Sequence, residues 1–118
     1  MSLDGPRHAL IIEDEILIAL EIEQLLQDEG FLSADVATTP REALICAKAH
    51  RPDLITADIR IAEGTGIEAV AAISSAIGEI PVVFVTGNAE MVRGRAEPVV
   101  EKPINPRDLH RAVEQLGL

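Results

Sequence analysis

The sequence predicts an α/β fold in which a parallel β-sheet is covered by helices on both faces. Short apolar runs alternate with longer segments of helical periodicity, and the runs are continuous, as in strands buried on both sides. The chain has 118 residues, of which 47% are hydrophobic and 25% charged, and this suits one compact core. We therefore expect a single domain over residues 1–118, with no room for a second.

The first unit is a strand over residues 9–12 followed by a helix over residues 16–29. Gly30 marks the end of this helix. Its apolar face is formed by Ile18, Ile22, Leu25 and Leu26. Residues 33–37 alternate weakly between apolar and polar side chains, which indicates a second strand at an edge of the sheet.

A capping box opens the second helix. In the run Thr39-Pro40-Arg41-Glu42, a threonine cap is followed by proline at the first helical position and by glutamate three residues after the cap. This helix is expected to run to about His50. Residues 54–57 then form the third buried strand, and after a glycine-bearing loop residues 67–77 form the third helix.

The last third of the chain contains two more strands. Residues 82–85, Val-Val-Phe-Val, are the most β-prone run, and residues 99–100 make a short fifth strand. Residues 88–97 are polar and interrupted by a glycine, so any helix there should be brief and mobile. Asn105 caps a final helix whose apolar face is Leu109, Ala112, Val113 and Leu116.

The charge balance excludes several classes of partner. Twenty acidic residues against ten basic ones give a net charge of -10, which repels nucleic-acid backbones and anionic membranes. The first seven residues lack the features of a secretory signal, and no apolar run approaches membrane-spanning length. We expect a cytoplasmic protein with no direct nucleic-acid or membrane partner.

The cysteine and the histidines give no sign of a site. Cys46 is the only cysteine, so no internal disulfide is expected, and its helical setting suits a small residue at the edge of the core. His8, His50 and His110 are scattered along the sequence without metal-ligand spacing. These histidines therefore predict no metal site, and zinc is not expected at the acidic ends of the strands either, because the side-chain ligands there are all oxygens with no His or Cys beside them.

Polar side chains follow four of the predicted strands. In a parallel doubly wound sheet, ligands bind beyond the carboxyl ends of the strands. The residues at these ends are Glu13 and Asp14, Asp58, Thr86 and Gly87, and Glu101, Lys102 and Pro103. The sequence thus predicts a cluster of carboxylates, a hydroxyl and an ammonium at one edge of the sheet.

These groups predict a divalent cation. With Lys102 as the only cation, the carboxylates of Glu13, Asp14 and Asp58 would leave a charge of about -2 in a crevice. The side-chain ligands on offer are oxygens, which favours Mg²⁺. The loop 59–66 allows the backbone carbonyl of Arg60 to reach the same ion.

An aspartate beside such an ion can attack phosphorus and form an acyl phosphate. Asp58 is the candidate nucleophile. Phosphoryl transfer needs mostly positioning and neutralisation of charge, which Lys102 and a hydroxyl donated by Thr86 can supply.

The motifs around these residues resemble the receiver domain of bacterial two-component response regulators over essentially the whole chain. The matching segments are residues 8–15, 53–58, 58–66, 82–87 and 101–103. The resemblance implies a flavodoxin-like sheet in the order 2-1-3-4-5, with a cis peptide bond between Lys102 and Pro103.

The resemblance also implies the function. Asp58 would be the phosphoacceptor in a Mg²⁺-dependent reaction, with Glu13 and Asp14 as the acidic pair and Thr86 and Lys102 touching the phosphoryl group. The partners would be a sensor histidine kinase or phosphotransfer protein and a downstream protein target. The resemblance leaves the oligomeric state open, and a weak homodimer is compatible with it. Such a domain is no enzyme toward other substrates, because it catalyses only its own phosphorylation and dephosphorylation.

Two departures from the family pattern concern the switch. Val99 stands where receivers usually have an aromatic residue, so an aromatic switch is absent. Only 16 positions separate Thr86 from Lys102, which indicates a shortened fourth helix. The run Phe84-Val85-Thr86-Gly87 is similar to the motif of the atypical FATGUY receivers, which have this shortening.

Three other functions are consistent with parts of this pattern. A pseudo-receiver that binds partners without phosphorylation is the alternative, although all the site residues are present. An aspartate-nucleophile phosphatase would normally need a second aspartate two residues after Asp58, where this chain has Arg60. A flavin-binding protein of the same fold is disfavoured because the chain has no Trp or Tyr to stack on a flavin.

Overall fold

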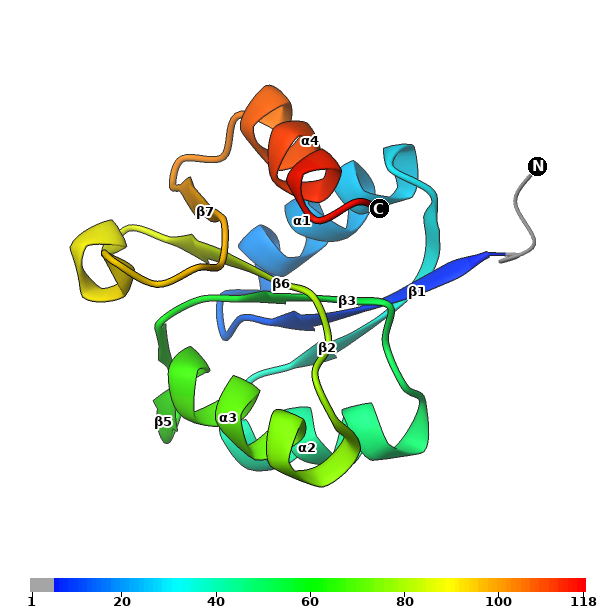
Figure 1. Ribbon diagram of the computed structural model, residues 1–118, viewed down its shortest axis with the longest axis vertical. Helices are drawn as coiled ribbons and strands as arrows, with labels where there is room; N and C mark the ends of the chain where they lie inside the picture. The colour runs from blue at the N-terminus through cyan, green and yellow to red at the C-terminus, as the bar shows by residue number, and fades with distance from the viewer. Residues whose placement is uncertain (1–5) are drawn as a thin grey trace.

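The computed structural model describes residues 6–118 and shows a central β-sheet between two layers of helices (Figure 1). The expectation that the first seven residues form no secretory signal concerns mainly residues 1–5, which lie outside the described residues. Within residues 6–118, none of the helices has both the length and the apolar character needed to cross a membrane.

The sheet has five parallel strands in the order β2-β1-β3-β6-β7. This is the predicted 2-1-3-4-5 order of a flavodoxin-like fold, because β6 and β7 are the fourth and fifth strands of this sheet along the chain. Strand β2 lies at one edge, as its weak alternation indicated. The strands are β1 (Arg7–Ile12), β2 (Phe31–Ala37), β3 (Leu54–Ala57), β6 (Val82–Thr86) and β7 (Val99–Glu101).

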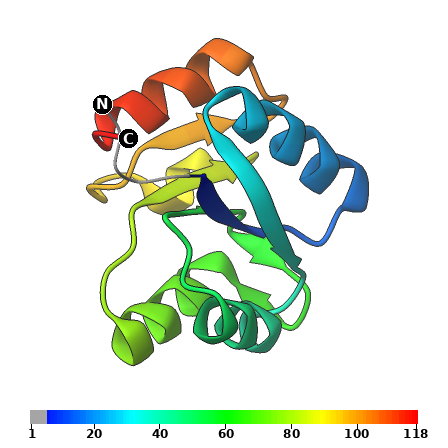
Figure 2. The same ribbon diagram turned by 90° about the vertical axis from the view of Figure 1, so that its right-hand side faces the viewer.

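Two helices cover each face of the sheet. Helices α1 (Ile16–Asp28) and α4 (Pro106–Gln115) lie on one face, and α2 (Pro40–Ala49) and α3 (Gly66–Ile77) lie on the other (Figures 1 and 2). Each face therefore has its own apolar core. The continuous apolar strands in the sequence reflect this double coverage.

Alternate residues of one strand supply the two cores. Leu10 and Ile12 of β1 pack toward α2 and α3, whereas Ala9 and Ile11 pack toward α1 and α4. All four side chains are at most 1% exposed. Strand β1 is thus fixed from both sides, and so is the position of the residues that follow it.

Local side-chain bonds set the helix starts. Thr39 Oγ1 accepts a hydrogen bond from the Glu42 amide at 3.0 Å, which confirms the predicted cap of α2. The Glu42 carboxylate accepts from the Thr38 amide at 2.7 Å, one residue before the cap. Asn105 caps α4 as predicted, by accepting from the Arg107 amide at 2.9 Å.

A small hairpin lies between β3 and α3. Strands β4 (Arg60–Ile61) and β5 (Gly64–Thr65) pair antiparallel, where the sequence indicated only a glycine-bearing loop. The turn contains Glu63 at a φ of 61°, a left-handed conformation uncommon for a residue other than glycine. A two-residue ladder is too short to leave a periodic signal in the sequence.

The fourth helix is reduced to a single 3-10 turn, η1 (Ala89–Val92), which appears in yellow at the left of Figure 1. This confirms the predicted shortening. Val92 is 1% exposed and packs into the core on the α2 and α3 face, so the turn is anchored by one side chain. Its mobility remains a prediction.

Gly66 brings the start of α3 against the residue that follows β3. A Cβ atom at position 66 would lie 1.9 Å from the backbone oxygen of Asp58. Gly66→Ala should therefore destabilise the fold by about 1–3 kcal/mol through overpacking. Gly87→Ala is the matched control, because a Cβ there meets no heavy atom within 4 Å. Urea unfolding of both variants checks this, and equal stability of the two would contradict it.

An ion pair between α4 and the end of α1 predicts a pH effect. The hydrogen bond of His110 Nδ1 to the Glu29 carboxylate, at 2.9 Å, raises the pKa of His110 above its usual 6.5, and Glu114 adds to the shift. A raised folded-state pKa gives stability that is fully present below pH 6.5 and is lost as pH rises through the folded value. Below pH 6.5 the His110→Gln variant should be less stable to unfolding than the wild type, and at alkaline pH the two should be equally stable. Urea unfolding across this range tests the trend, and a constant difference would refute it.

Candidate functional site

The carboxyl ends of β1, β3, β6 and β7 meet at one edge of the sheet, and the predicted site residues lie there. Glu13 follows β1, Asp58 follows β3, Thr86 ends β6, and Lys102 follows β7. Residues 89 positions apart in sequence, Glu13 and Lys102, come into direct contact because the strands that carry them are parallel.

Lys102 joins two carboxylates from different strands. Its Nζ donates to Glu13 Oε1 at 2.7 Å and to Asp58 Oδ2 at 2.8 Å. Glu13 is 1% exposed and Asp58 is 7% exposed, so both carboxylates are largely removed from water. Such pairs are charge-assisted hydrogen bonds that fix side-chain positions closely.

Backbone amides hold the remaining carboxylate oxygens. The Glu15 amide donates to Glu13 Oε2 at 3.2 Å, and the Ile59 amide donates to Asp58 Oδ1 at 2.7 Å. Asp58 is therefore oriented from two sides, by Ile59 and by Lys102. A carboxylate held in this way is already positioned before any ligand arrives.

Burial and charge act in opposite directions on this cluster. Burial raises the pKa of Glu13 above its usual 4.5, although the hydrogen bond from Lys102 opposes that rise. Burial lowers the pKa of Lys102, but its hydrogen bonds to Asp58 and Glu13 outweigh this and raise it overall. The ammonium is thus firmly charged, and one positive charge faces two buried carboxyl groups.

Thr86 lies beside this cluster on the neighbouring strand. Its side chain is fully buried, and its Oγ1 accepts a hydrogen bond from the Asn88 amide at 3.0 Å. Its backbone oxygen accepts from the Lys102 amide at 3.1 Å. Because a hydroxyl can accept and donate at once, Thr86 keeps its own hydrogen for a further acceptor.

Asp14 and Arg60 lie farther out. Both residues are exposed, and the ion pairs of Lys102 go to Glu13 and Asp58 rather than to Asp14. Arg60 stands in β4, on the hairpin that follows Asp58. The structure thus brings three of the predicted residues, Glu13, Asp58 and Lys102, into direct contact, and the other two are exposed at the same end of the sheet.

The donor set at this edge fits a hard divalent cation. Glu13, Asp14 and Asp58 offer carboxylate oxygens, which Mg²⁺ prefers over nitrogen or sulfur. The raised pKa of Glu13 shows that the positive charge of Lys102 does not offset the cost of burying this carboxylate. Added positive charge would favour its ionised form.

Sequence reasoning missed several backbone contacts of the site. The amides of Ile59 and Asn88, and the close approach of Gly66, position Asp58 and Thr86 without any distinctive side chain. A backbone amide has no sequence signature, so no pattern could have identified these contacts.

The expectation that the histidines show no sign of a site is wrong for His8 and His50, which are far apart in sequence but adjacent in the fold. The rings of His8 and His50 stack with centroids 3.6 Å apart, next to Asp35. The chain leaves β1 and returns at the end of α2, which brings residues 42 positions apart together. Cys46 is half-buried, and burial raises the pKa of its thiol, which agrees with a residue at the edge of the core.

Comparisons with known proteins agree with this architecture. The chain is 36% identical over 121 residues to the phyllosphere-induced regulator PhyR of Methylorubrum extorquens, covering 98% of this chain and 45% of that protein. It is 34% identical over 114 residues to the transcriptional regulatory protein PdtaR of Mycobacterium tuberculosis, covering 92% and 56%. The chain thus spans about half the length of these relatives.

A solved structure shows the same fold. The receiver domain of the Erythrobacter litoralis PhyR response regulator superposes with a TM-score of 0.87 at 30% identity, covering 98% of this chain and 92% of that one. The similarity to PhyR fits the atypical subgroup with a shortened fourth helix. The family model described as the response regulator receiver domain matches residues 9–114, from the first core residue of β1 to the last turn of α4, and the chain therefore belongs to this family.

Proposed function

We propose that residues 1–118 act as one receiver domain that is switched by phosphorylation of Asp58. The phosphoryl donor is the phosphohistidine of a sensor histidine kinase or a phosphotransfer protein, and the transfer takes place in the cytoplasm. The observation that supports this most is the double anchoring of Asp58, by the Ile59 amide at 2.7 Å and by Lys102 at 2.8 Å. It orients a buried carboxylate as a nucleophile.

In the proposed transfer, a carboxylate oxygen of Asp58 attacks the phosphorus of the phosphohistidine. A P–O bond forms while the P–N bond breaks, and the imidazole leaves with the electron pair and takes up a proton. Lys102 stays next to the reacting oxygens and offsets negative charge, and Thr86 donates its free hydroxyl hydrogen to the arriving phosphoryl group.

Mg²⁺ would be held at this site by Glu13, Asp14, Asp58 and the backbone carbonyl of Arg60. When bound, the ion would supply positive charge that offsets the phosphoryl oxygens. Glu13 stays hydrogen-bonded to Lys102, which keeps the ammonium beside Asp58.

The proposed switch acts through the segment after β6. Phosphorylation changes Asp58 from a charge of -1 to about -2 and gives Thr86 a stronger acceptor. Because Thr86 Oγ1 also accepts from the Asn88 amide, a movement of Thr86 changes the start of the segment 88–97. We infer that this segment is ordered on phosphorylation and that its new surface binds the downstream protein target.

The partners follow from the same proposal. With a net charge of -10, the domain acts through proteins rather than through nucleic acid or membranes. A weak homodimer is compatible with it. The alternative, a pseudo-receiver that binds without phosphorylation, is decided by the first experiment below.

Incubation with acetyl phosphate and Mg²⁺ should add one phosphoryl group to the domain, measured as intact mass. Chelation of Mg²⁺ should reduce the modified fraction at least tenfold, and Asp58→Asn should abolish it. Asp28→Asn, an exposed aspartate at the end of α1, is the matched control and should leave it unchanged. Modification that persists in Asp58→Asn would overturn the assigned residue, and no modification at all would favour the pseudo-receiver.

Phosphorylation should slow amide hydrogen exchange across residues 88–97, measured by mass spectrometry on the phosphorylated domain. Thr86→Ala should still accept a phosphoryl group but lose most of this protection, because the hydroxyl that accepts from Asn88 is gone. Thr86→Ser keeps the hydroxyl and should restore the protection. Unchanged exchange in the phosphorylated wild type would reject this segment as the switch.

A further inference from the structure

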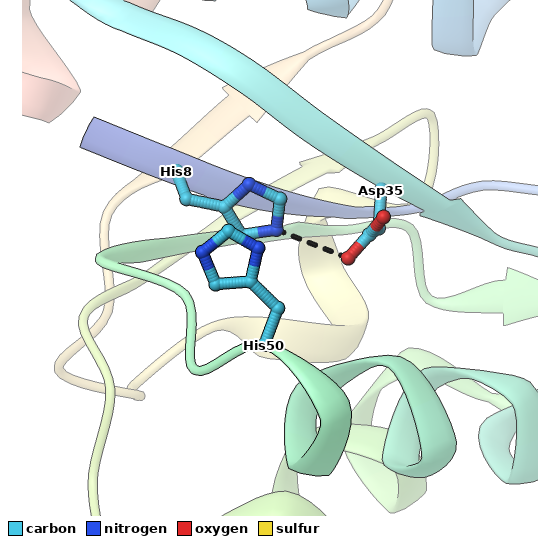
Figure 3. Close-up of side chains that lie close together, drawn as sticks. All are labelled: His8, Asp35 and His50. Carbon is cyan, nitrogen blue, oxygen red and sulfur yellow. Dashed lines mark hydrogen bonds and ion pairs between the residues drawn. The ribbon is translucent and has the colours of Figure 1, made fainter. Parts of the chain in front are cut away.

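Three potential metal ligands gather at the far end of β1 from the Asp58 site. His8 lies near the start of β1, Asp35 on β2, and His50 at the end of α2 (Figure 3). One ligand atom from each residue lies within 4.8 Å of the other two. Glu13, by contrast, follows the opposite end of β1, so the two clusters are separate.

The fold holds His8 firmly in place. The residue is 5% exposed, and its backbone amide donates to Asp53 Oδ2 at 2.8 Å while its carbonyl accepts from the Asp53 amide at 2.7 Å. Its ring Nδ1 lies 2.8 Å from Ser33 Oγ, and its Nε2 lies 3.0 Å from Asp35 Oδ2. The Ser33 hydroxyl on Nδ1 is an outer-shell partner of the kind that orients a ligating histidine, and it leaves Nε2 on the side of the Asp35 carboxylate.

The second imidazole lies directly over the first. The ring centroids of His8 and His50 are 3.6 Å apart, and the interplanar angle is 10°. The two rings overlap in the view of Figure 3. Each ring offers a nitrogen that can ligate a transition metal ion, and the adjacent Asp35 offers a carboxylate oxygen.

We propose that His8, Asp35 and His50 form a binding site for a divalent transition metal ion of the zinc class. Two imidazole nitrogens and one carboxylate oxygen suit Zn²⁺, whereas Mg²⁺ prefers the all-oxygen set at the other end of the sheet. Three protein ligands leave a fourth tetrahedral position for water or an incoming group.

One side chain has to turn for the ion to bind. Imidazole lone pairs lie in the ring plane, so two parallel rings do not point at a common ion. Ligand atoms of a tetrahedral zinc are about 3.3 Å apart, closer than the 4.8 Å within which these atoms lie. His50 is exposed and follows the last residue of α2, so its ring can rotate toward the Nε2 of His8 while the buried ring stays fixed.

The bound ion would connect the end of α2 to β1 and β2, which already pair with each other in the sheet and share the hydrogen bonds of His8 to Ser33 and Asp35. His50 brings the end of α2, Asp35 the edge strand β2, and His8 the central strand β1. Such a link stabilises the edge of the sheet and does not require phosphorylation of Asp58. The proposal is therefore independent of the proposed function.

The test is titration of the whole domain with Co²⁺ and Zn²⁺ in excess Mg²⁺, which occupies the carboxylate cluster around Asp58. We expect one Co²⁺ per chain with visible absorption typical of tetrahedral coordination, and its displacement by Zn²⁺. His50→Gln and Asp35→Asn should each weaken binding at least tenfold. Both side chains lie at or near the surface, and circular dichroism checks that the variants fold.

His110→Gln is the matched control, because His110 is an exposed histidine that also lies beside carboxylates, those of Glu29 and Glu114. It should bind Co²⁺ like the wild type. Nitrogen NMR of the imidazoles should show shifts for His8 and His50 on Zn²⁺ addition and none for His110. The proposal is overturned if no ion binds, if His50→Gln and Asp35→Asn bind as tightly as the wild type, or if His110→Gln weakens binding equally.

Discussion

The ammonium of Lys102 lies between two buried carboxylates that belong to two other strands, and the carboxyl-end rim of the sheet depends on this contact. One positive charge removed from water needs partners, and the bonds of 2.7 Å and 2.8 Å to Glu13 and Asp58 supply them. The same contact leaves the cluster short of positive charge. The cluster is therefore fixed by its hydrogen bonds and still carries excess negative charge.

Apolar packing makes the burial of the Glu13 and Asp58 carboxylates possible. The helices on both faces fix β1 and β3 with apolar contacts, and that packing offsets the cost of burying Glu13 and Asp58. Gly66 shows how closely the surrounding backbone is fitted, because even a methyl group there would overlap the Asp58 carbonyl. The Asp58 carboxylate is held by hydrogen bonds from Ile59 and Lys102, and positioned groups of this kind are what the proposed phosphoryl transfer requires.

The sequence predicts the features that rest on local patterns and misses those that rest on contacts across the fold. Apolar runs locate the strands, and parallel pairing then brings Glu13, Asp58 and Lys102 to one edge. The cap at Thr39 is likewise readable within four residues. The stacking of His8 on His50 depends on how β1, β2 and α2 are arranged in three dimensions, so no spacing in the sequence reveals it.

The shortened segment after β6 constrains the proposed route from the site to the surface. Val99 is half-exposed at the start of β7 and offers no ring that could rotate into a space vacated by Thr86. The segment is instead tied down at separate points: the Asn88 amide on Thr86, the buried Val92, and Arg95 placed over the Phe84 ring at 5.6 Å. If one of these three attachments is lost, the backbone between it and the next attachment along the chain is no longer held. The proposed switch therefore acts through backbone attachment rather than through a rotating aromatic, because of the residues that this chain has in these places.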